Sequence, residues 1–182
     1  ACDKEYEYIR KILLQFKDPA SKEKAFRNLL SNYQERLYYH VRRYVTNHDD
    51  ANDVLQNVCI KIWNAIDNFR GESGLYTWLY RIASNEAITY INKVKKHPTV
   101  DIETSNAKCR AGTDNMEADE LTAKLQRAID ALPDKQKQVF IMRYYDEMPY
   151  EKMAEIAETS VGALKASYHH AVKKIEDFML NH

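Results

Sequence analysis

The chain has 182 residues, which is enough for one medium domain or two small ones. Its four glycines and four prolines amount to about a third of ordinary usage, and so few turn residues exclude an all-β fold. The 27 Lys and Arg residues balance the 27 Asp and Glu residues, so no overall basic field marks a nucleic-acid-binding protein. The sequence has neither an apolar run of the roughly 18 residues that span a membrane nor a signal-peptide core. We therefore expect a cytoplasmic protein without membrane insertion.

Helical periodicity dominates the first 97 residues. Apolar residues recur every three or four positions in four segments, which we expect to form four helices. The predicted segments are Ile9–Phe16, Phe26–Val41, Val54–Ile66 and Leu75–Ile91. The polar cluster Asn47–Asp50 supplies N-cap residues for the third helix, and Gly71 and Gly74 bracket a loop before the fourth.

A polar, acidic stretch separates this half from the next. Residues 98–118 lack apolar periodicity and cannot bury enough surface to offset the entropy of ordering them, so we expect a flexible linker. Helical periodicity then resumes over Leu121–Leu132, Asp134–Tyr145, Tyr150–Ala157 and Ser160–Met179. The prediction is an all-α protein with two small helical domains, residues 1–97 and 119–182, joined by an acidic linker.

The last two predicted helices fit a helix-turn-helix. A short helix, a turn of three or four residues and a longer helix opened by Ser160 match the motif, whose second helix lies in the major groove of DNA. No acidic residue occurs between Ser160 and Ile175, and the exposed positions of this helix include Lys165, His169 and Lys173. Any pair of antiparallel helices produces a similar pattern, so a weakly basic solvent face is the competing interpretation.

Aromatic and arginine residues crowd the predicted loop after Asn68 and the helix that follows it. Aromatic rings can stack on unpaired bases, and arginine can contact phosphate or stack in turn. Asn85, further along the helix, can form two hydrogen bonds with a base edge. The competing interpretation is that Phe69 and Trp78 belong to the hydrophobic core. It applies much less to Arg70, Tyr76 and Arg81.

No pattern in the chain is typical of a metal site or of catalysis. Cys2, Cys59 and Cys109 lack the CxxC spacing, which argues against both a disulfide framework and a zinc site. His169 and His170 are adjacent, so their side chains diverge by about 100° on a helix and cannot chelate one ion together. The acidic residues near the turn at 146–149 form a solvated face, with no nucleophile and base beside them. We expect no metal, no cofactor and no enzymatic activity.

Two long segments resemble a known family. The run DDANDVLQNVCIKIW (Asp49–Trp63), followed by FRGESGLYTWLYRIASNEAITYI (Phe69–Ile91), is similar to region two of the extracytoplasmic-function (ECF) sigma factors of the sigma-70 family. The run from Ala131 to Ile175 resembles region four of the same family. The resemblance covers about residues 8–97 and 119–179, in the order and with the gap of that family.

This resemblance implies a function and its site residues. The chain would be an alternative sigma factor that binds core RNA polymerase and directs promoter-specific transcription initiation, and an anti-sigma factor would be a further partner. The helix Asp50–Trp63 would bind core polymerase. The implied contacts are Asp50, Asp53, Gln56, Asn57, Ile60 and Trp63.

The other two implied surfaces bind promoter DNA. The loop and helix after Asn68 would recognise and open the minus-ten element, with one base flipped from the duplex. The implied residues are Phe69, Arg70, Ser73, Tyr76, Trp78, Arg81, Asn85, Asn92 and Lys93. The last helix would recognise the minus-thirty-five element through Ser160, Val161, Lys165, Ser167, His169 and Lys173.

The chain departs from the family pattern at a few positions. Ser167, His170 and Val172 stand where arginine is usual, and Cys59 replaces an aromatic residue. Glu158–Thr159 replaces the usual Leu-Gly, so a looser turn is expected.

Two competing functions are weaker. A stand-alone helix-turn-helix regulator leaves the Asp50–Trp63 and Phe69–Arg81 motifs without a role. A hydrolase built on the acidic turn and the His pair has no converging geometry.

Overall fold

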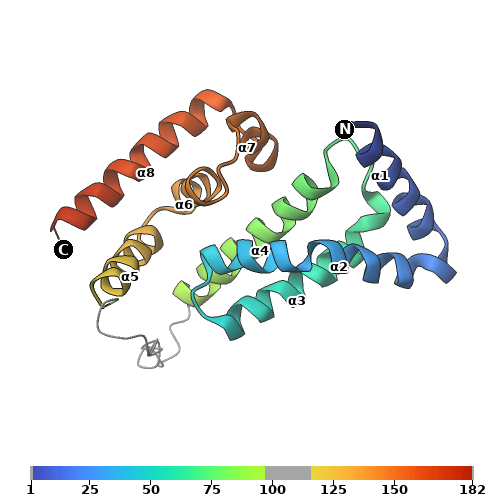
Figure 1. The fold of residues 1–182 in the computed structure, drawn as a ribbon, viewed down its shortest axis with the longest axis horizontal. Helices are drawn as coiled ribbons and strands as arrows, with labels where there is room; N and C mark the ends of the chain where they lie inside the picture. Colours follow the sequence, from blue (N-terminus) through green and yellow to red (C-terminus); the bar gives the residue numbers. More distant parts are fainter. Residues whose placement is uncertain (1, 97–115, 182) are drawn as a thin grey trace. The chain divides into compact units, whose positions relative to one another are not determined.

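The regular structure of the described part of the chain is entirely helical, which confirms the predicted fold class. The computed structural model describes residues 2–96 and 116–181 (Figure 1). The chain divides into two compact units, residues 1–97 and 98–182. The first unit contains α1 (Cys2–Lys17), α2 (Pro19–Tyr44), α3 (His48–Ala65), a short 3-10 turn η1 (Ile66–Asn68) and α4 (Leu75–Lys96). The second contains α5 (Met116–Asp130), α6 (Asp134–Phe140), the π-helical segment η2 (Ile141–Tyr145), α7 (Tyr150–Ala157) and α8 (Val161–Asn181).

The predicted linker mostly lies outside the described residues. Its residues 98–115 are among those that the structure does not describe, and residues 116–118 form the start of α5. Glu117 and Asp119 fall in the first turn of α5, where their negative charge complements the exposed N–H groups of the helix end. In the sequence, the acidic residues at the start of this helix therefore resemble the acidic residues of a linker.

Packing of α3 and α4 against α2 forms the core of the first unit. Leu37 and Val41 of α2, Ile62 of α3 and Leu79 and Ala83 of α4 are buried there. Their spacing of three and four residues turns one face of each helix inward, and the polar residues between them consequently face solvent. Helix α1 packs on α2 at the side of this core.

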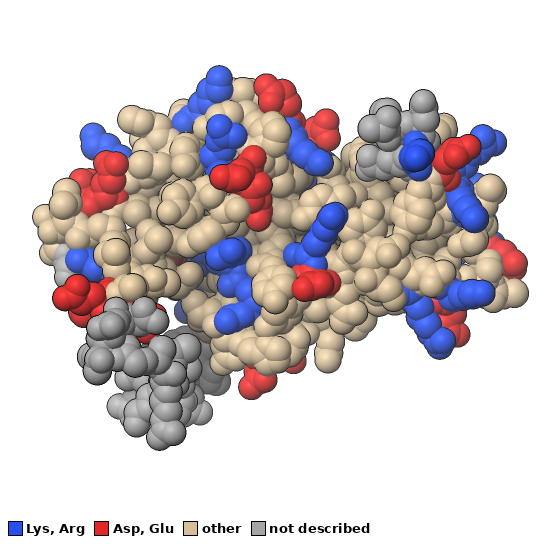
Figure 2. Space-filling model, viewed as in Figure 1, with Lys and Arg blue, Asp and Glu red and all other residues tan. Residues whose placement is uncertain are grey.

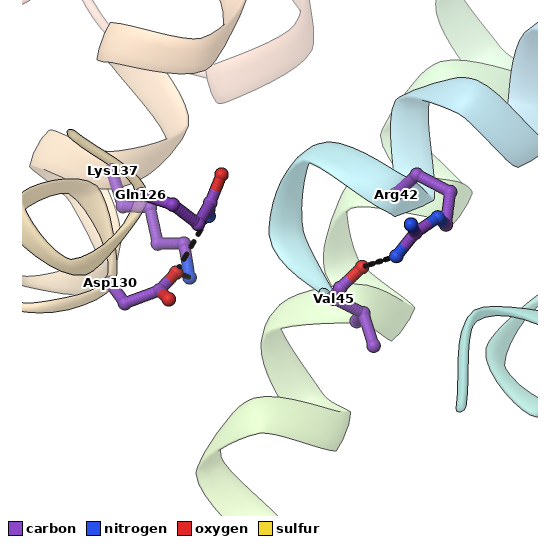
Figure 3. Close-up of polar contacts among 5 residues, drawn as sticks. All are labelled: Arg42, Val45, Gln126, Asp130 and Lys137. Atoms are coloured by element: carbon purple, nitrogen blue, oxygen red, sulfur yellow. Dashed lines mark hydrogen bonds and ion pairs between the residues drawn. The ribbon is translucent and has the colours of Figure 1, made fainter. Parts of the chain in front are cut away.

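Helix boundaries in this unit follow capping residues. Asp18 caps α2 directly before Pro19, and the Asn47 side chain accepts hydrogen bonds from the backbone N–H groups of Asp49 (2.8 Å) and Asp50 (3.4 Å) at the start of α3. At the other end of α2, Arg42 donates a hydrogen bond to the carbonyl oxygen of Val45 at 3.0 Å (Figure 3). The predicted cap in the 47–50 cluster is confirmed.

A buried histidine joins α2 to α4. The Nε2 atom of His40 lies 2.7 Å from the hydroxyl oxygen of Ser84, and the His40 ring lies over the Tyr80 ring with centroids 3.5 Å apart. Burial lowers the pKa of His40 to about 3, because the charged imidazolium would lose its hydration in this apolar site. His40 is therefore neutral in the folded protein at neutral pH.

Helix α8 organises the second unit, because α5, α6 and α7 all pack against it. Leu164, Ala171 and Ile175 are its buried residues. At the junction of α5 and α6, the buried Lys137 pairs with Asp130 at 3.2 Å, and Gln126 donates to the same carboxylate oxygen at 3.0 Å (Figure 3). The pair neutralises a buried charge that would otherwise oppose folding.

The segment predicted as one helix over Asp134–Tyr145 changes character at Ile141. It continues as the π-helical η2, and the backbone N–H of Asp146 accordingly donates to the carbonyl of Ile141 at 3.3 Å. The wider turn keeps Ile141 and Met142 buried, and the Tyr144 ring stacks on Phe140 with centroids 5.0 Å apart. Periodicity alone does not distinguish such a segment from an α-helix.

The turn between α7 and α8 is tight despite its sequence. Glu158 adopts the left-handed conformation (φ 52°, ψ 45°), and its N–H and that of Thr159 both donate to the carbonyl of Ala154. Glycine is the residue that adopts this conformation without steric cost. The expected looser turn is thus replaced by a tight turn with a strained residue.

Among the helices of residues 2–96 and 116–181, none is both long and apolar enough to cross a membrane.

We expect the first unit to lose stability in acid through His40. Its pKa is lowered in the folded state, so the stabilisation is complete above the unfolded pKa of about 6.5 and is lost as the pH falls toward 3. One linked proton gives a slope of at most about 1.4 kcal/mol per pH unit. The measurement is urea unfolding followed by tryptophan fluorescence, because Trp63 and Trp78 both lie in the first unit. His40→Gln should flatten this slope between pH 6 and 4, and equal slopes in both proteins would contradict the assignment.

We expect Glu158→Gly to stabilise the second unit by about 1 kcal/mol, because glycine removes the cost of the left-handed backbone. The matched control is Glu155→Gly. It places glycine at an exposed position inside α7 and should destabilise by about 1 kcal/mol. Thermal unfolding followed by far-UV circular dichroism measures both. If both variants were destabilised, the Glu158 side chain would contribute more to stability than its left-handed backbone costs.

Candidate functional site

A solvent-exposed stripe runs along α3. Asp53, Gln56, Asn57 and Ile60 are all exposed and are separated by three, one and three residues, so they share one face of the helix. Ile60 is 58% exposed and lies among the polar residues of this stripe.

Asp50 and Trp63, the first and last of the predicted polymerase contacts on α3, are less exposed than the contacts between them. Asp50 is half-buried and accepts a hydrogen bond from Tyr90 of α4. Burial, this bond and the charges of Asp50 and Asp53 raise the pKa of Tyr90 to about 12. Trp63 packs edge-on against Phe26 with ring centroids 5.1 Å apart, and so it is held by α2.

A cavity of about 390 Å³ lies beside this stripe, between α3 and α4. It is lined by Asp53 and Asn57 from α3 and by Glu86, Thr89 and Tyr90 from α4. Glu86 is buried and forms an ion pair with Lys61 of α3. The sequence analysis missed Glu86 and Lys61. The signal in the sequence was an acidic residue at a core position of the predicted α4 helix.

The loop at residues 69–74 is anchored by its first residue. Phe69 is only 8% exposed, and its ring lies 4.9 Å from that of Trp78, centroid to centroid. Gly71 adopts φ 74°, a conformation that permits the chain to turn back here and that side chains strain to adopt. Arg70 is exposed and Ser73 is half-buried. The core interpretation therefore holds for Phe69.

Helix α4 separates the remaining aromatic and polar residues onto two sides. Trp78, Arg81, Asn85 and Asn92 occur at spacings of three, four and seven residues and share one face. Asn85 is exposed, and Trp78, Arg81 and Asn92 are half-buried. Lys93 is exposed at the end of this helix.

Tyr76 does not lie on the face of α4 that carries Trp78 and Asn85. Its ring stacks on Tyr33 of α2 with centroids 6.0 Å apart, and the Arg36 guanidinium lies 5.6 Å above the Tyr76 ring. The position of Tyr76, two residues before Trp78, places it on the other side of the helix. Tyr33 and Arg36 were not among the predicted site residues.

The helix-turn-helix places three predicted residues in one row. Lys165, His169 and Lys173 are exposed at successive spacings of four residues along α8. The Ser160 hydroxyl accepts a hydrogen bond from the N–H of Ala163 at 3.2 Å and thereby caps this helix. Ser167 is half-buried and, at two residues from Lys165 and His169, lies on a different side. Val161 is also half-buried.

An aromatic platform missed by the sequence analysis supports this row. The Arg143 guanidinium and the Lys165 ammonium lie 4.6 Å and 5.6 Å from the centre of the Tyr150 ring. Cation–π contacts of this kind fix long side chains that otherwise sample many rotamers. Tyr150, the first residue of α7, therefore orients Lys165 at the start of α8.

Charge is mixed over the molecule. Figure 2 shows Lys and Arg interspersed with Asp and Glu on the visible face, in agreement with the equal totals of the sequence. Within residues 2–96 and 116–181, no group of three or more His, Cys, Asp or Glu side chains has the arrangement of a metal site.

Comparison with known families identifies both units. Residues 29–97 match the Sigma-70 region 2 family, and residues 122–175 match the Sigma-70 region 4 family. The ECF RNA polymerase sigma-E factor of Haemophilus influenzae is 36% identical over 166 residues, which cover 85% of this chain and 87% of that protein. The sigma-E factor of Escherichia coli K12 is 33% identical, with coverage of 85% and 86%.

Solved structures agree on the fold. CnrH, solved in complex with the cytosolic domain of CnrY, superposes with a TM-score of 0.65 at 19% identity and covers 93% of this chain and 96% of that chain. The sigma factor RpoE of Bartonella quintana, in complex with the anti-sigma factor NepR, gives 0.63 at 23% identity, with coverage of 87% and 98%.

Sigma-70 proteins are transcription initiation factors without catalytic activity of their own. Two family regions in the expected order and relatives at 33–36% identity over most of the chain leave one conclusion. The chain belongs to the ECF sigma factors of the sigma-70 family, the alternative sigma factors that bind RNA polymerase and direct transcription initiation.

Proposed function

We propose that three exposed helix surfaces divide the work of this sigma factor. The α3 stripe binds core RNA polymerase, the 69–74 loop with one face of α4 opens the minus-ten element, and α8 reads the minus-thirty-five element. The observation that carries the proposal is the stripe of Asp53, Gln56, Asn57 and Ile60, which is exposed to solvent on a helix whose other face is core. The two functional domains are residues 1–97 and the unit that begins with α5, residues 116–182, and residues 98–115 link them.

The composition of the α3 stripe favours a protein partner. Interfaces commonly combine a desolvated apolar centre with a polar rim, and Ile60 with Asp53 and Gln56 provides both. The pairs Lys61–Glu86 and Tyr90–Asp50 attach α3 to α4 on this side. The stripe is thereby held rigid before binding, which lowers the entropic cost of association. Trp63 contributes to this surface as a support, because its ring packs on Phe26.

The surface of α4 favours unpaired bases over duplex DNA. Asn85 offers a donor and an acceptor for a base edge, and Trp78 on the same face offers a ring. Extrusion of a base costs a few kcal/mol, which stacking and edge hydrogen bonds can offset. The buried Phe69 packs on the Trp78 ring and supports it, and the exposed Arg70 is available to phosphate.

By itself, the α8 surface would bind duplex DNA weakly. Lys165, His169 and Lys173 form its exposed row, and Lys174 is the one further lysine between Ser160 and Ile175, so few phosphate contacts are available and the dependence on salt would be shallow. The arginine-to-serine and arginine-to-histidine departures at Ser167 and His170 remove further cations. We propose that promoter binding needs the polymerase, which holds both domains on the same DNA.

Similarity to other sigma factors also suggests a regulatory partner and a cellular location for this chain. CnrH and RpoE were each solved with a partner protein, CnrY and the anti-sigma factor NepR. We propose that an anti-sigma factor likewise binds this chain. We also propose that the protein works in the cytoplasm, where RNA polymerase lies, and that it has no enzymatic activity.

The direct test is transcription in vitro with core RNA polymerase on genomic fragments. The chain should produce discrete transcripts that core enzyme alone does not produce, and the start sites then define its promoters. Sequence-specific DNA binding by the free chain at nanomolar concentration and physiological salt, without any transcript in the presence of core enzyme, would instead indicate a stand-alone regulator.

Charge reversal at Asp53 should weaken binding to core polymerase by about 2–5 kcal/mol, because a desolvated interface charge would face its partner with the wrong sign. Glu7→Arg is the matched control, since Glu7 is an exposed acid on α1 and lines neither of the cavities beside α3. Titration of labelled chain with core enzyme measures both. Asp53→Arg that binds as tightly as the control would remove Asp53 from the interface, as expected of a solvated surface acid.

Asn85→Ala should reduce open complex while closed complex is retained, because a base reaches the α4 face only after it leaves the duplex. The Asn85 side chain is exposed, so its loss should not affect folding. Asn28→Ala, an exposed asparagine on α2, is the control. Permanganate reactivity of promoter thymines reports open complex, and gel mobility reports closed complex. Equal loss of both complexes would assign Asn85 to duplex contact.

A further inference from the structure

Two adjacent histidines lie on the exposed side of α8. His169 and His170 are both exposed, and the centres of their rings lie 5.9 Å apart. Neither imidazole has a hydrogen bond or an ion pair with another group of residues 2–96 and 116–181. Histidine is the side chain whose charge changes between about pH 5 and 8, so these two residues differ chemically from the lysines of the same helix. We call them the histidine pair.

The histidine pair lies in a stretch of α8 that contains cations and no acids. No acidic residue occurs between Ser160 and Ile175, and the first acids beyond this stretch are Glu176 and Asp177. Three exposed lysines lie four residues from one or the other histidine and therefore share its side of the helix. These lysines are Lys165, Lys173 and Lys174. A ligand on this side of α8 would meet the lysines and the histidine pair together.

The elements packed against α8 direct their charged and titratable groups to other positions of the helix. Lys124 of α5 donates to the carbonyl of Met179, and the buried Lys137 of α6 pairs with Asp130. From η2 and α7, the groups near Lys165 and Tyr168 are Arg143, Tyr144 and Tyr150. None of these contacts involves the histidine pair. Its charge is therefore determined by solvent and by whatever binds this side of α8.

Duplex DNA would supply the anionic partner that the described part of the chain does not provide. An opposite charge within about 4–6 Å favours the charged form of a titratable group. DNA carries one negative charge per about 1.7 Å of its axis, so a helix in the major groove is flanked by phosphates. An exposed imidazole on such a helix gains a reason to be protonated only when DNA is bound.

We propose that the histidine pair takes up protons when α8 binds the minus-thirty-five element, so that promoter affinity rises as the pH falls. The proposal rests on the proposed role of α8 in promoter binding. With both imidazoles charged, the three lysines and two histidines between Ser160 and Ile175 make five cations. By linkage, a binding step that takes up protons is favoured at a higher proton concentration. Acidification of the cytoplasm would therefore increase occupancy of these promoters.

The test uses holoenzyme formed from the full chain and core polymerase. The probes are two fluorescent duplexes of a promoter defined by the transcription assay: a long probe that includes the minus-thirty-five element, and a short probe that ends downstream of it. The ratio of the long-probe to the short-probe affinity, at constant ionic strength, isolates the α8 contact. For wild type this ratio should be about tenfold larger at about pH 6 than at about pH 8. The salt slope of the ratio should steepen by up to about 1.8, since each added phosphate contact contributes about 0.9.

Two double variants fix the charge of the histidine pair. His169→Gln/His170→Gln should show, at both pH values, the ratio of wild type at about pH 8, because glutamine gains no charge. His169→Arg/His170→Arg should show a high ratio at both pH values, because the guanidinium remains charged. Lys174→Gln is the matched control, since it removes a fixed cation from the same side of α8 and should retain the rise at lower pH. All these proteins retain His40, so its titration affects them equally.

The outcomes separate the two proposals. Equal affinity of wild-type holoenzyme for both probes at both pH values would overturn the proposed role of α8. A long-probe preference that does not rise at lower pH, or a rise that the glutamine variant retains, would overturn proton uptake by the histidine pair alone. A glutamine variant whose ratio is already below that of wild type at about pH 8 would also overturn it, because the imidazoles would then act as neutral groups.

Discussion

The attachment of α4 to α2 and α3 is the constraint on which both proposed surfaces of the first unit depend. Burial of Leu79 and Ala83 against α2 and α3 fixes which side of α4 remains outside, and that side carries Asn85. The Lys61–Glu86 pair and the Tyr90–Asp50 hydrogen bond then fix α3 on α4 at the polar margin of the core. The proposed polymerase-binding stripe and the proposed base-binding face therefore lie on two helices that these contacts hold together.

Much of this arrangement was accessible from the sequence, because helix spacing, caps and core residues obey local rules. The Asn47 cap, the loop closed by Gly71 and the helix-turn-helix all follow from residue types at fixed offsets. The π-helical η2 does not, because the same apolar spacing fits an α-helix. The tight turn at Glu158 was also missed, because the chain adopts the left-handed conformation there without the glycine that usually signals it.

Candidate site residues were harder to place than helices, because an aromatic residue fits a core and a binding surface equally well. Tyr76 and Trp78 are two residues apart, and only contacts with α2 reveal that Tyr76 stacks on Tyr33. Trp63 likewise packs on Phe26. Glu86 and Tyr90 were missed because their importance lies in partners on α3, far away in the sequence. Spacing identifies the face of a helix, and only tertiary structure identifies its neighbour.

The zero net charge of the chain bears on how such a protein can be specific. Each proposed DNA surface carries few cations, so each alone would bind DNA weakly at physiological salt. A second contact made within one assembly is intramolecular, and its effective concentration can raise the overall affinity by factors of 10² or more. Weak individual surfaces then become an advantage, since a single surface that met a matching sequence by chance would dissociate quickly. Occupancy would require polymerase and both DNA contacts together, which restricts binding to genuine promoters.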